Sequence, residues 1–277
     1  MFHYTNPTGL LGICDAKQLW AGRASDMNDE TEQLLAIERG RQDITNWLNV
    51  RRPATQAVVE LLERMRAEMQ GANRQIYTVS LSVKRDVLSR WRAYCPRSGG
   101  AALGLPAAQL RAAAHDQGFY LARCLYDNAS QWRLIHELVQ NHVDTYSVKC
   151  ANSPDGESKH AEAAVKALAQ DVARYGPLIK HESFAEEHEW RLVSAPSHVA
   201  DARLIFRPGA TGYRVYLLFD LLTPSHPTFD TSVPGDGPGV VVGPSVDSNA
   251  EQLAVQMVLD KNFGSGCWHG RTDSPYR

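Results

Sequence analysis

The sequence predicts an α+β fold in which one domain, residues 1–277, is organised around a split mixed β-sheet. Three observations support this prediction. Short stretches rich in β-branched and aromatic residues recur from the first residues to the last third of the chain and predict strands. Segments with helical spacing separate these strands in irregular order, which is typical of α+β proteins. Two helical stretches, at about 29–70 and 127–175, are best explained as insertions between strands of the same sheet.

The N-terminal part alternates short strands with helices. The run Phe2-His3-Tyr4-Thr5 predicts a strand because turn-forming residues follow it directly, and a helical turn over 10–13 and a strand over 18–21 come next. Asn28 suits the N-cap of a helix, since acidic residues beyond it favour the positive end of the helix dipole. Pro53 is expected to open a second helix, whose apolar residues over 58–69 recur at helical spacing.

The pattern changes to alternation at residues 75–82, which predict a strand with Ser80 and Ser82 on one face. A short helix over 86–94 follows and places Trp91 and Tyr94 on one side. Further helices are expected over 106–115, about 127–146, 161–174 and 249–262, and further strands over 101–105, 119–126, 189–194, 203–207, 213–219 and 239–243.

Composition narrows the classes of protein. The hydrophobic fraction of 43% is ample for a packed core, and 29 basic against 31 acidic residues give no basic field that would favour nucleic acid or anionic membrane. The five cysteines lack C-x-x-C spacing, which indicates reduced thiols in cytoplasm and neither a disulfide framework nor a zinc site. Without a signal-peptide pattern or a run of about 18 apolar residues, we expect a cytoplasmic protein that does not span a membrane.

Motifs for common chemistry are missing from the sequence. The glycines match neither a P-loop nor a Rossmann fingerprint, and no G-x-S-x-G elbow supports a hydrolase triad. His136 and His142 lie six residues apart and do not share a helical face as metal-binding histidines do. We therefore expect no bound metal.

His3 is the first candidate functional residue. A histidine in a terminal strand is fixed and oriented, which a ligand-binding role requires. The alternative is a structural histidine that hydrogen-bonds a carbonyl, and the residue type alone favours this alternative.

A second candidate site lies where a predicted loop enters a strand. Glu187 and Glu189 stand two residues apart there, and the period of two places both of them and Arg191 on one face. Such a face is either an ion-paired strand edge or a fixed negative charge that a sheet offers to a cationic transition state.

Five ordered motifs together resemble a large bacterial family known only as a domain of unknown function, over nearly the whole chain. They are His3-Tyr4-Thr5; Leu19-Trp20-Ala21 with Met27-Asn28-Asp29-x-x-Glu32; Ser80-Leu81-Ser82 followed by Trp91 and Tyr94; Glu187-x-Glu189-Trp190-Arg191-Leu192-Val193; and Val240-Val241-Val242-Gly243-Pro244. The proline that family members often carry after the Asn-Asp pair is missing here.

The layout of these motifs is similar, more loosely, to that of the ADP-ribosyltransferase superfamily, which includes toxins that modify protein or nucleic acid. This resemblance implies a sheet core of the ADP-ribosyltransferase-like type and NAD⁺ as the cofactor that is consumed. It implies a cofactor-binding set made of His3, Tyr4, Thr5, Ser80, Ser82, Trp91, Tyr94 and Arg191.

The same resemblance implies roles for the catalytic candidates His3, Glu187 and Glu189. His3 would hold the nicotinamide ribose, Ser80 or Ser82 would brace the site, and Trp91 or Tyr94 would stack on nicotinamide. Glu189 would be the catalytic glutamate, and Glu187 would orient the acceptor. The chemistry is consistent, because loss of neutral nicotinamide leaves an oxocarbenium-like ribose that needs a nearby anion.

Two functions follow as expectations. The first is an NAD-dependent ADP-ribosyltransferase that modifies a macromolecular acceptor, protein or nucleic acid, as a bacterial toxin or an anti-phage defence effector, with NAD⁺ hydrolysis as a side activity. The second is a catalytically inactive nucleotide-sensing or interaction module of a defence system, since Glu187, Glu189 and Arg191 could form a saturated ion-pair network. The sequence identifies neither the acceptor nor the oligomeric state.

Overall fold

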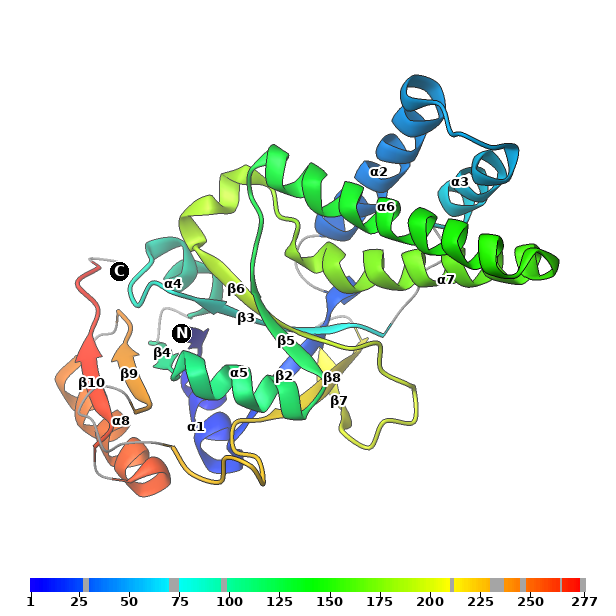
Figure 1. Ribbon diagram of the computed structural model, residues 1–277. Coiled ribbons are helices and arrows are strands. Elements are labelled where there is room, and N and C mark those ends of the chain that lie inside the picture. The colour runs from blue at the N-terminus through cyan, green and yellow to red at the C-terminus, as the bar shows by residue number, and fades with distance from the viewer. Residues whose placement is uncertain are drawn as a thin grey trace.

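Helices and strands alternate along the chain, and the fold class is α+β as expected (Figure 1). The structure is a computed structural model that describes residues 1–26, 30–69, 75–95, 99–209, 212–229, 237–244, 248–264 and 266–274. The strands are β1 (Phe2–Thr5), β2 (Gln18–Arg23), β3 (Tyr77–Ser82), β4 (Ala101–Gly104), β5 (Phe119–Arg123), β6 (Glu189–Ser194), β7 (Leu204–Gly209), β8 (Gly212–Asp220), β9 (Gly239–Val242) and β10 (Trp268–Arg271).

The helices lie between these strands. They are α1 (Pro7–Ala16), α2 (Glu30–Asn46), α3 (Gln56–Glu68), α4 (Leu88–Tyr94), α5 (Ala107–Asp116), α6 (Asn128–Asn152), α7 (Glu157–Tyr175) and α8 (Ser248–Phe263). Short turns of 3₁₀ helix include η5 (Gly176–Leu178) and η6 (Glu182–Glu187), and a π-helical turn covers Trp47–Arg51.

Local chemistry explains where several helices begin. Asn6, Thr55 and Asp127 have extended backbones, and each side chain accepts a hydrogen bond from the backbone N–H three residues on, so they N-cap α1, α3 and α6. The expectation that Pro53 opens its helix is wrong, because the cap lies at Thr55. The expected cap Asn28 lies outside the described residues, with its neighbours Met27 and Asp29.

Ten strands of the described chain form one sheet that is mostly antiparallel. Its order is β10-β9-β4-β1-β3-β2-β8-β7, while β6 pairs with the other edge of β3 and β5 pairs with β6. Only β9 and β10 run parallel among the described strand pairs. The sequence analysis missed β10, because its four residues, Trp268–Arg271, show no alternation.

The centre of the sheet is β3, whose two edges have different partners. Five residues of β3 pair with β6 along one edge. The other edge is divided, since Phe2 of β1 pairs with Ser82 at one end and Gly22 of β2 pairs with Thr78 at the other. The sheet therefore forks at β3, and Ser80 lies between the two branches.

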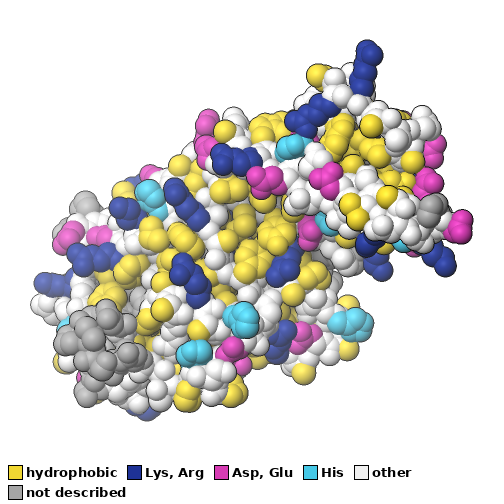
Figure 2. Space-filling model, in the orientation of Figure 1, with side chains coloured by type: hydrophobic (Ala, Val, Ile, Leu, Met, Phe, Trp, Pro, Cys, Tyr) yellow, Lys and Arg dark blue, Asp and Glu magenta, His cyan; other side chains and the backbone are white. Residues whose placement is uncertain are grey.

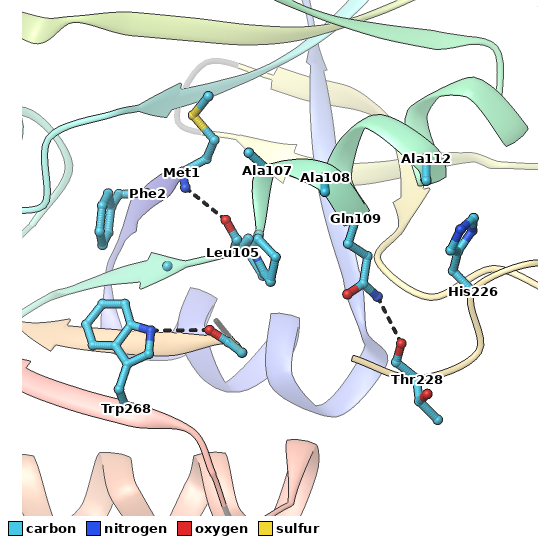
Figure 3. Close-up of a pocket in the computed structure, with 13 residues that line it drawn as sticks. Met1, Phe2, Leu105, Ala107, Ala108, Gln109, Ala112, His226, Thr228 and Trp268 are labelled. Atoms are coloured by element: carbon cyan, nitrogen blue, oxygen red, sulfur yellow. Dashed lines mark hydrogen bonds between the residues drawn. The ribbon is translucent and has the colours of Figure 1, made fainter. Parts of the chain in front are cut away.

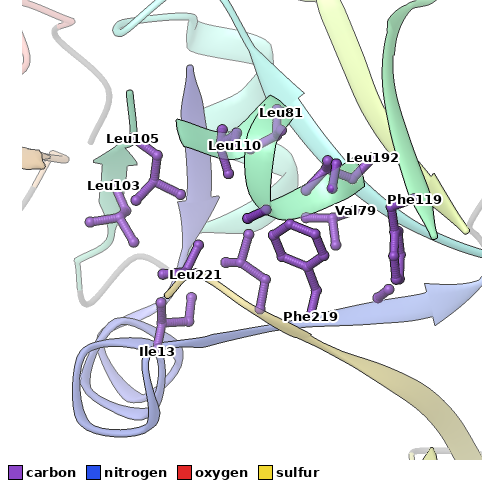
Figure 4. Packing of buried hydrophobic residues seen from close by; sticks show 14 of the residues in the cluster. Ile13, Val79, Leu81, Leu103, Leu105, Leu110, Phe119, Leu192, Phe219 and Leu221 are labelled. Carbon is purple, nitrogen blue, oxygen red and sulfur yellow. The ribbon is translucent and has the colours of Figure 1, made fainter. Parts of the chain in front are cut away.

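The two largest of four apolar clusters among the described residues lie on the sheet and between the helices. One lies against the sheet under α1 and α5 and contains Val79, Leu81, Leu192 and Phe219 (Figure 4). The other is formed by the helices of both stretches expected as insertions, where α2 and α3 pack with α6 and α7 beside the sheet (Figure 1). In α7 the buried residues follow a spacing of three and four: Ala161, Ala164, Val165, Leu168, Ala169 and Val172.

Candidate functional site

Strands β3 and β6 place the polar candidates together on one face of the sheet. Ser80 pairs with Arg191 and Ser82 pairs with Glu189, so all four share a face, as the period of two predicts. The intervening residues Val79, Leu81 and Leu192 point into the apolar core on the opposite face. The polar face is covered by α4 and by the segment between η5 and η6, which bring further charges to it.

Glu189 is the centre of this polar cluster, and its side chain is 0% exposed. Its Oε1 accepts hydrogen bonds from Ser80 Oγ at 2.5 Å and from Arg191 Nε at 2.9 Å. Its Oε2 accepts from Lys180 Nζ at 2.5 Å. Burial alone would raise the pKa of Glu189, but the charges of Arg191, Lys180 and Arg90 outweigh it and hold that pKa well below its usual range.

Arg90 is a member of the cluster that sequence reasoning missed. It is 1% exposed, and its Nη2 lies 3.2 Å from Glu187 Oε2 and 3.6 Å from Glu189 Oε2. Its guanidinium also lies near the rings of Tyr4 and Tyr94, at 5.9 Å and 5.7 Å from their centroids. The spacing of four residues to Tyr94 on α4 is the one sequence signal that could have identified it.

Lys180 is the second member that the sequence analysis missed. It follows Ile179, which forms an isolated bridge with Leu125, and its backbone N–H donates to the carbonyl of Leu125 at 3.0 Å. The amide of Gln131 donates to the Lys180 carbonyl at 2.8 Å, which fixes the loop further. The Lys180 ammonium then reaches both Glu187 Oε2, at 2.9 Å, and Glu189. No pattern in the sequence indicates this placement, because it depends on contacts between distant segments.

The charges of the cluster do not balance among the described residues. Three cations, Arg90, Lys180 and Arg191, face two carboxylates, Glu187 and Glu189. Burial of ion pairs costs desolvation energy that their mutual attraction repays only when the geometry is good and further hydrogen bonds are made.

His3 hydrogen-bonds a carbonyl at the fork of the sheet. Its Nδ1 lies 3.1 Å from the carbonyl oxygen of Ser80, the residue that lies between the β1 and β2 pairings. Because a carbonyl can only accept, Nδ1 is the donor, and in the neutral ring Nε2 is then an acceptor. Burial lowers the pKa of His3, opposed by the bond to Ser80 and helped by the charge of Arg90, so the ring is neutral at pH 7.

The structural alternative for His3 therefore agrees with the observed contact. A role in holding ribose is still compatible with it, but Nε2 would accept a hydroxyl proton. His3 and Ser80 are both partly exposed, as is Tyr94, whereas Glu189 behind them is fully buried. These three residues form the accessible side of the cluster.

The two aromatic candidates of α4 occupy different environments. Trp91 is 0% exposed; its indole N–H donates to Asp86 at 2.6 Å and its ring packs edge-to-face on Tyr4, with centroids 4.7 Å apart. Tyr4 is also buried, and its hydroxyl donates to the Lys84 carbonyl. Trp91 and Tyr4 thus pack in the interior, and Tyr94 is the aromatic candidate that borders the charged cluster.

Thr5 and Ser82 make backbone contacts near the cluster. Thr5 pairs with Ala101, and its carbonyl accepts from the Cys95 thiol at 3.5 Å. Ser82 is buried, donates to the carbonyl of Glu187 at 2.8 Å and accepts from the Lys84 N–H at 3.0 Å. Ser82 therefore orients the segment that carries Glu187, while Ser80 contacts Glu189 itself.

The described residues also bear on metal binding and on membrane insertion. Within the described ranges, no group of three or more His, Cys, Asp or Glu side chains is arranged to hold a metal ion. His136 contacts Asp43 and His142 contacts Asp171, each as a separate pair. No helix in the described part of the chain has the length and apolar character needed to cross a membrane.

Comparison with known proteins gives a family match for the central segment. No curated protein and no solved structure gives a match. Residues 90–192, which run from within α4 to within β6, match a family described as "Protein of unknown function (DUF2971)". This segment contains Arg90, Lys180, Glu187, Glu189 and Arg191, so the charged side chains of the candidate site lie within the stretch that the family shares.

Proposed function

We propose that the protein binds NAD⁺ at the fork of the sheet and transfers ADP-ribose to a macromolecular acceptor. One observation carries the proposal: His3, Ser80 and Glu189 come from three neighbouring strands and form a continuous series of contacts, from imidazole to carbonyl and from hydroxyl to carboxylate. This order joins a sugar-binding side chain to a buried anion, which is the combination that cleavage of a cationic N-glycoside requires.

The Ser80 hydroxyl indicates how a ribose would be held. It donates to Glu189 Oε1, which is the contact that the 2′-hydroxyl of the nicotinamide ribose would make in the reaction. Ser80 is partly exposed, so a sugar hydroxyl entering beside His3 takes its place at the carboxylate while Nε2 of His3 accepts from the neighbouring hydroxyl. In this proposal the ring of Tyr94, which borders the cluster, stacks on nicotinamide, and the guanidinium of Arg90 beside it attracts the pyrophosphate.

The reaction balances with these groups. The bond between C1′ of the ribose and the nicotinamide nitrogen breaks, and its electron pair leaves with the base, which departs neutral. A nucleophile of the acceptor then bonds C1′ and loses a proton to solvent or to a carboxylate. Glu189 stabilises the positive charge that develops on the ribose, a contribution of about a hundredfold or more in rate.

A second candidate is a nucleotide-binding module without catalysis. It is favoured by the bonds that Glu189 already makes, since Ser80, Arg191 and Lys180 occupy both oxygens and three cations surround the carboxylate. An anion neutralised in this way stabilises an oxocarbenium ion less than a free one. Such a protein binds NAD⁺ and releases no nicotinamide.

Labelled NAD⁺ distinguishes the two functions. The protein is incubated with NAD⁺ carrying label in its adenosine part, with and without whole-cell lysate, and released nicotinamide and labelled protein or nucleic acid are quantified. We expect the wild type to release nicotinamide and transfer label, and Glu189→Gln to lose at least a hundredfold in rate. NAD⁺ binding by calorimetry without any release by the wild type would instead establish the non-catalytic module.

The control variant is Glu186→Gln. Glu186 lies in the same turn, η6, but is exposed, so this variant removes one carboxylate without entering the cluster. Folding of each variant is checked by circular dichroism, and rates are referred to the folded fraction. Undiminished nicotinamide release by folded Glu189→Gln protein would refute the catalytic role of Glu189.

A further inference from the structure

A cavity of about 640 Å³ opens beside the start of β1, separate from the charged cluster (Figure 3). Phe2, Leu105 and Trp268 form apolar walls, and the first turns of α5 form another through Ala108 and Ala112. This volume lies within the range of about 300–1,000 Å³ that is usual for small-molecule sites.

Glycines in the strands beside Trp268 leave room for its indole ring. Trp268 pairs with Gly239 of β9, Gly239 with Gly104 of β4, and Gly104 with Phe2 of β1, so the four residues lie in one row. A Cβ added to Gly239 would lie 2.0 Å from the indole, and one added to Gly104 would lie 2.5 Å from it. Glycine inside a strand weakens the strand, and here it allows a flat ring to lie against the backbone.

Further contacts orient this ring. The indole N–H donates to the carbonyl of Gly237 at 3.2 Å, and Phe2 packs edge-to-face on Trp268 with centroids 5.9 Å apart. The two rings therefore form a rigid aromatic corner of the cavity (Figure 3). A rigid aromatic surface binds flat rings by stacking at little cost in side-chain entropy.

The polar groups of the cavity include the α-ammonium group of Met1, which donates to the Leu105 carbonyl at 2.8 Å. The described lining includes no Asp, Glu, Lys or Arg side chain, and its polar side chains are Gln109, His226 and Thr228. The Gln109 amide makes one long contact, from Nε2 to the Thr228 carbonyl at 3.3 Å. A side-chain amide offers a donor and an acceptor together, which complements the edge of a nucleobase and of adenine in particular.

The position of the cavity relates it to the charged cluster. Phe2 lines the cavity and pairs with Ser82, and the next residue, His3, contacts Ser80. One strand, β1, therefore borders both sites. Successive side chains of a strand point to opposite faces, so Phe2 and His3 link the two sites through the backbone of β1 and not through one face.

We propose that this cavity binds a nucleobase, stacked on Trp268 and recognised by Gln109. The base has two sources with the same chemistry, the adenine of NAD⁺ or a separate nucleoside, and the link to NAD⁺ rests on the proposed function.

The test measures binding of NAD⁺, adenosine, cytidine and nicotinamide mononucleotide by calorimetry. Trp268→Ala removes the stacking surface, and Ala112→Phe fills the cavity while leaving Trp268 in place, so the second variant stays informative if the first fails to fold. We expect both variants to bind adenosine at least tenfold more weakly and to keep the wild-type affinity for nicotinamide mononucleotide. We expect the wild type to bind adenosine more tightly than cytidine. Trp20→Ala, which removes an exposed tryptophan of β2, is the matched control.

Competition identifies the source of the base. Displacement of adenosine by NAD⁺, with NAD⁺ affinity reduced in both cavity variants, assigns the cavity to the adenine of NAD⁺; adenosine binding to NAD⁺-saturated protein assigns it to a separate nucleoside. Unchanged affinity for every adenine compound in both variants, or no adenosine binding by the wild type, overturns the inference. Nicotinamide release is measured in parallel, so loss of the proposed function with intact adenosine binding is recognised separately.

Discussion

The two faces of strands β3 and β6 both contain fully buried side chains but have opposite chemistry. On one face Val79, Leu81 and Leu192 pack into the main apolar core. On the other, Ser80, Glu189 and Arg191 lie among Arg90 and Lys180, with Glu189 and Leu192 both 0% exposed. An apolar residue gains free energy from burial itself, whereas a buried charge is tolerated only while its partners are in place. The polar face is therefore tolerated only while its hydrogen bonds and ion pairs are complete.

The face of the molecule in Figure 2 shows no comparable separation of polar from apolar side chains. Figure 2 shows Lys and Arg side chains interspersed with Asp and Glu over one face, in keeping with a net charge of -2. A dense group of charged side chains lies instead in the interior, at the cluster around Glu189. Substitutions on the two faces of β3 and β6 test whether this contrast is energetic as well as compositional.

Glu189→Gln is expected to have the largest effect on stability. It keeps the shape of the side chain but leaves Arg90, Lys180 and Arg191 without their shared anion, so the free energy of unfolding should fall by about 3–5 kcal/mol. Urea unfolding of wild type and variant measures this difference. Adding Lys180→Met to Glu189→Gln removes one of the cations that have lost this carboxylate and should recover part of the loss.

The control for this prediction is Glu186→Gln, which should change stability by no more than about 0.5 kcal/mol because Glu186 is exposed. A loss for Glu189→Gln no larger than that of the control would contradict the argument. It would mean that the cluster gains little from its central carboxylate.

Leu192→Ala tests the apolar face at the position next to Arg191. It should lower the free energy of unfolding by about 2–5 kcal/mol, because it leaves a cavity in a packed core. Leu253→Ala on α8, where the leucine is 62% exposed, is the matched control and should have little effect. A second substitution, Lys180→Met, separates the two faces. It should restore part of the free energy of unfolding of Glu189→Gln and leave that of Leu192→Ala unchanged. Equal recovery in both variants would contradict the distinction between the faces.

The sequence allowed much of this arrangement to be predicted, because it depends on local periodicity. Alternation placed Ser80 and Ser82 on one face of their strand, and Glu189 and Arg191 on one face of theirs. In the structure β3 and β6 pair so that these four side chains share one face of the sheet. Arg90 and Lys180 were not predicted. Lys180 reaches the cluster only because Ile179 bridges Leu125 and Gln131 holds the loop, contacts that join segments remote in sequence.

The fold was predictable to a similar depth. Strands with β-branched or aromatic residues were found from composition, whereas β10 was missed because it adds to β9 through backbone pairing and carries no alternating pattern. The aromatic candidates show the same limit. Helical spacing put Trp91 and Tyr94 on one side of α4, but only packing against Tyr4 decides that Trp91 is interior.

The smallest predicted effect on the free energy of unfolding is that of His3, which lies at the fork of the sheet. Burial lowers the pKa of His3 below its usual value of 6.5, so between these two values the unfolded chain binds a proton that the folded protein does not. The contribution of His3 to the free energy of unfolding is therefore fully present above about pH 6.5 and is lost as the pH falls below that value. His3→Gln keeps a donor for the Ser80 carbonyl and does not titrate, so it is the matched variant.

The free energy of unfolding of wild type and His3→Gln is measured from pH 5 to pH 8. Because the two proteins differ only at residue 3, the contributions of all other groups cancel in the difference, and wild type should lose stability relative to His3→Gln as the pH falls. The nearby Arg90 acts in the same direction, since its charge opposes protonation of the ring. A difference that stays constant across this range would show that the ring at the fork is as free to protonate in the folded protein as in the unfolded chain. Nε2 could then serve as a donor, and the acceptor role proposed for it at the ribose would fail.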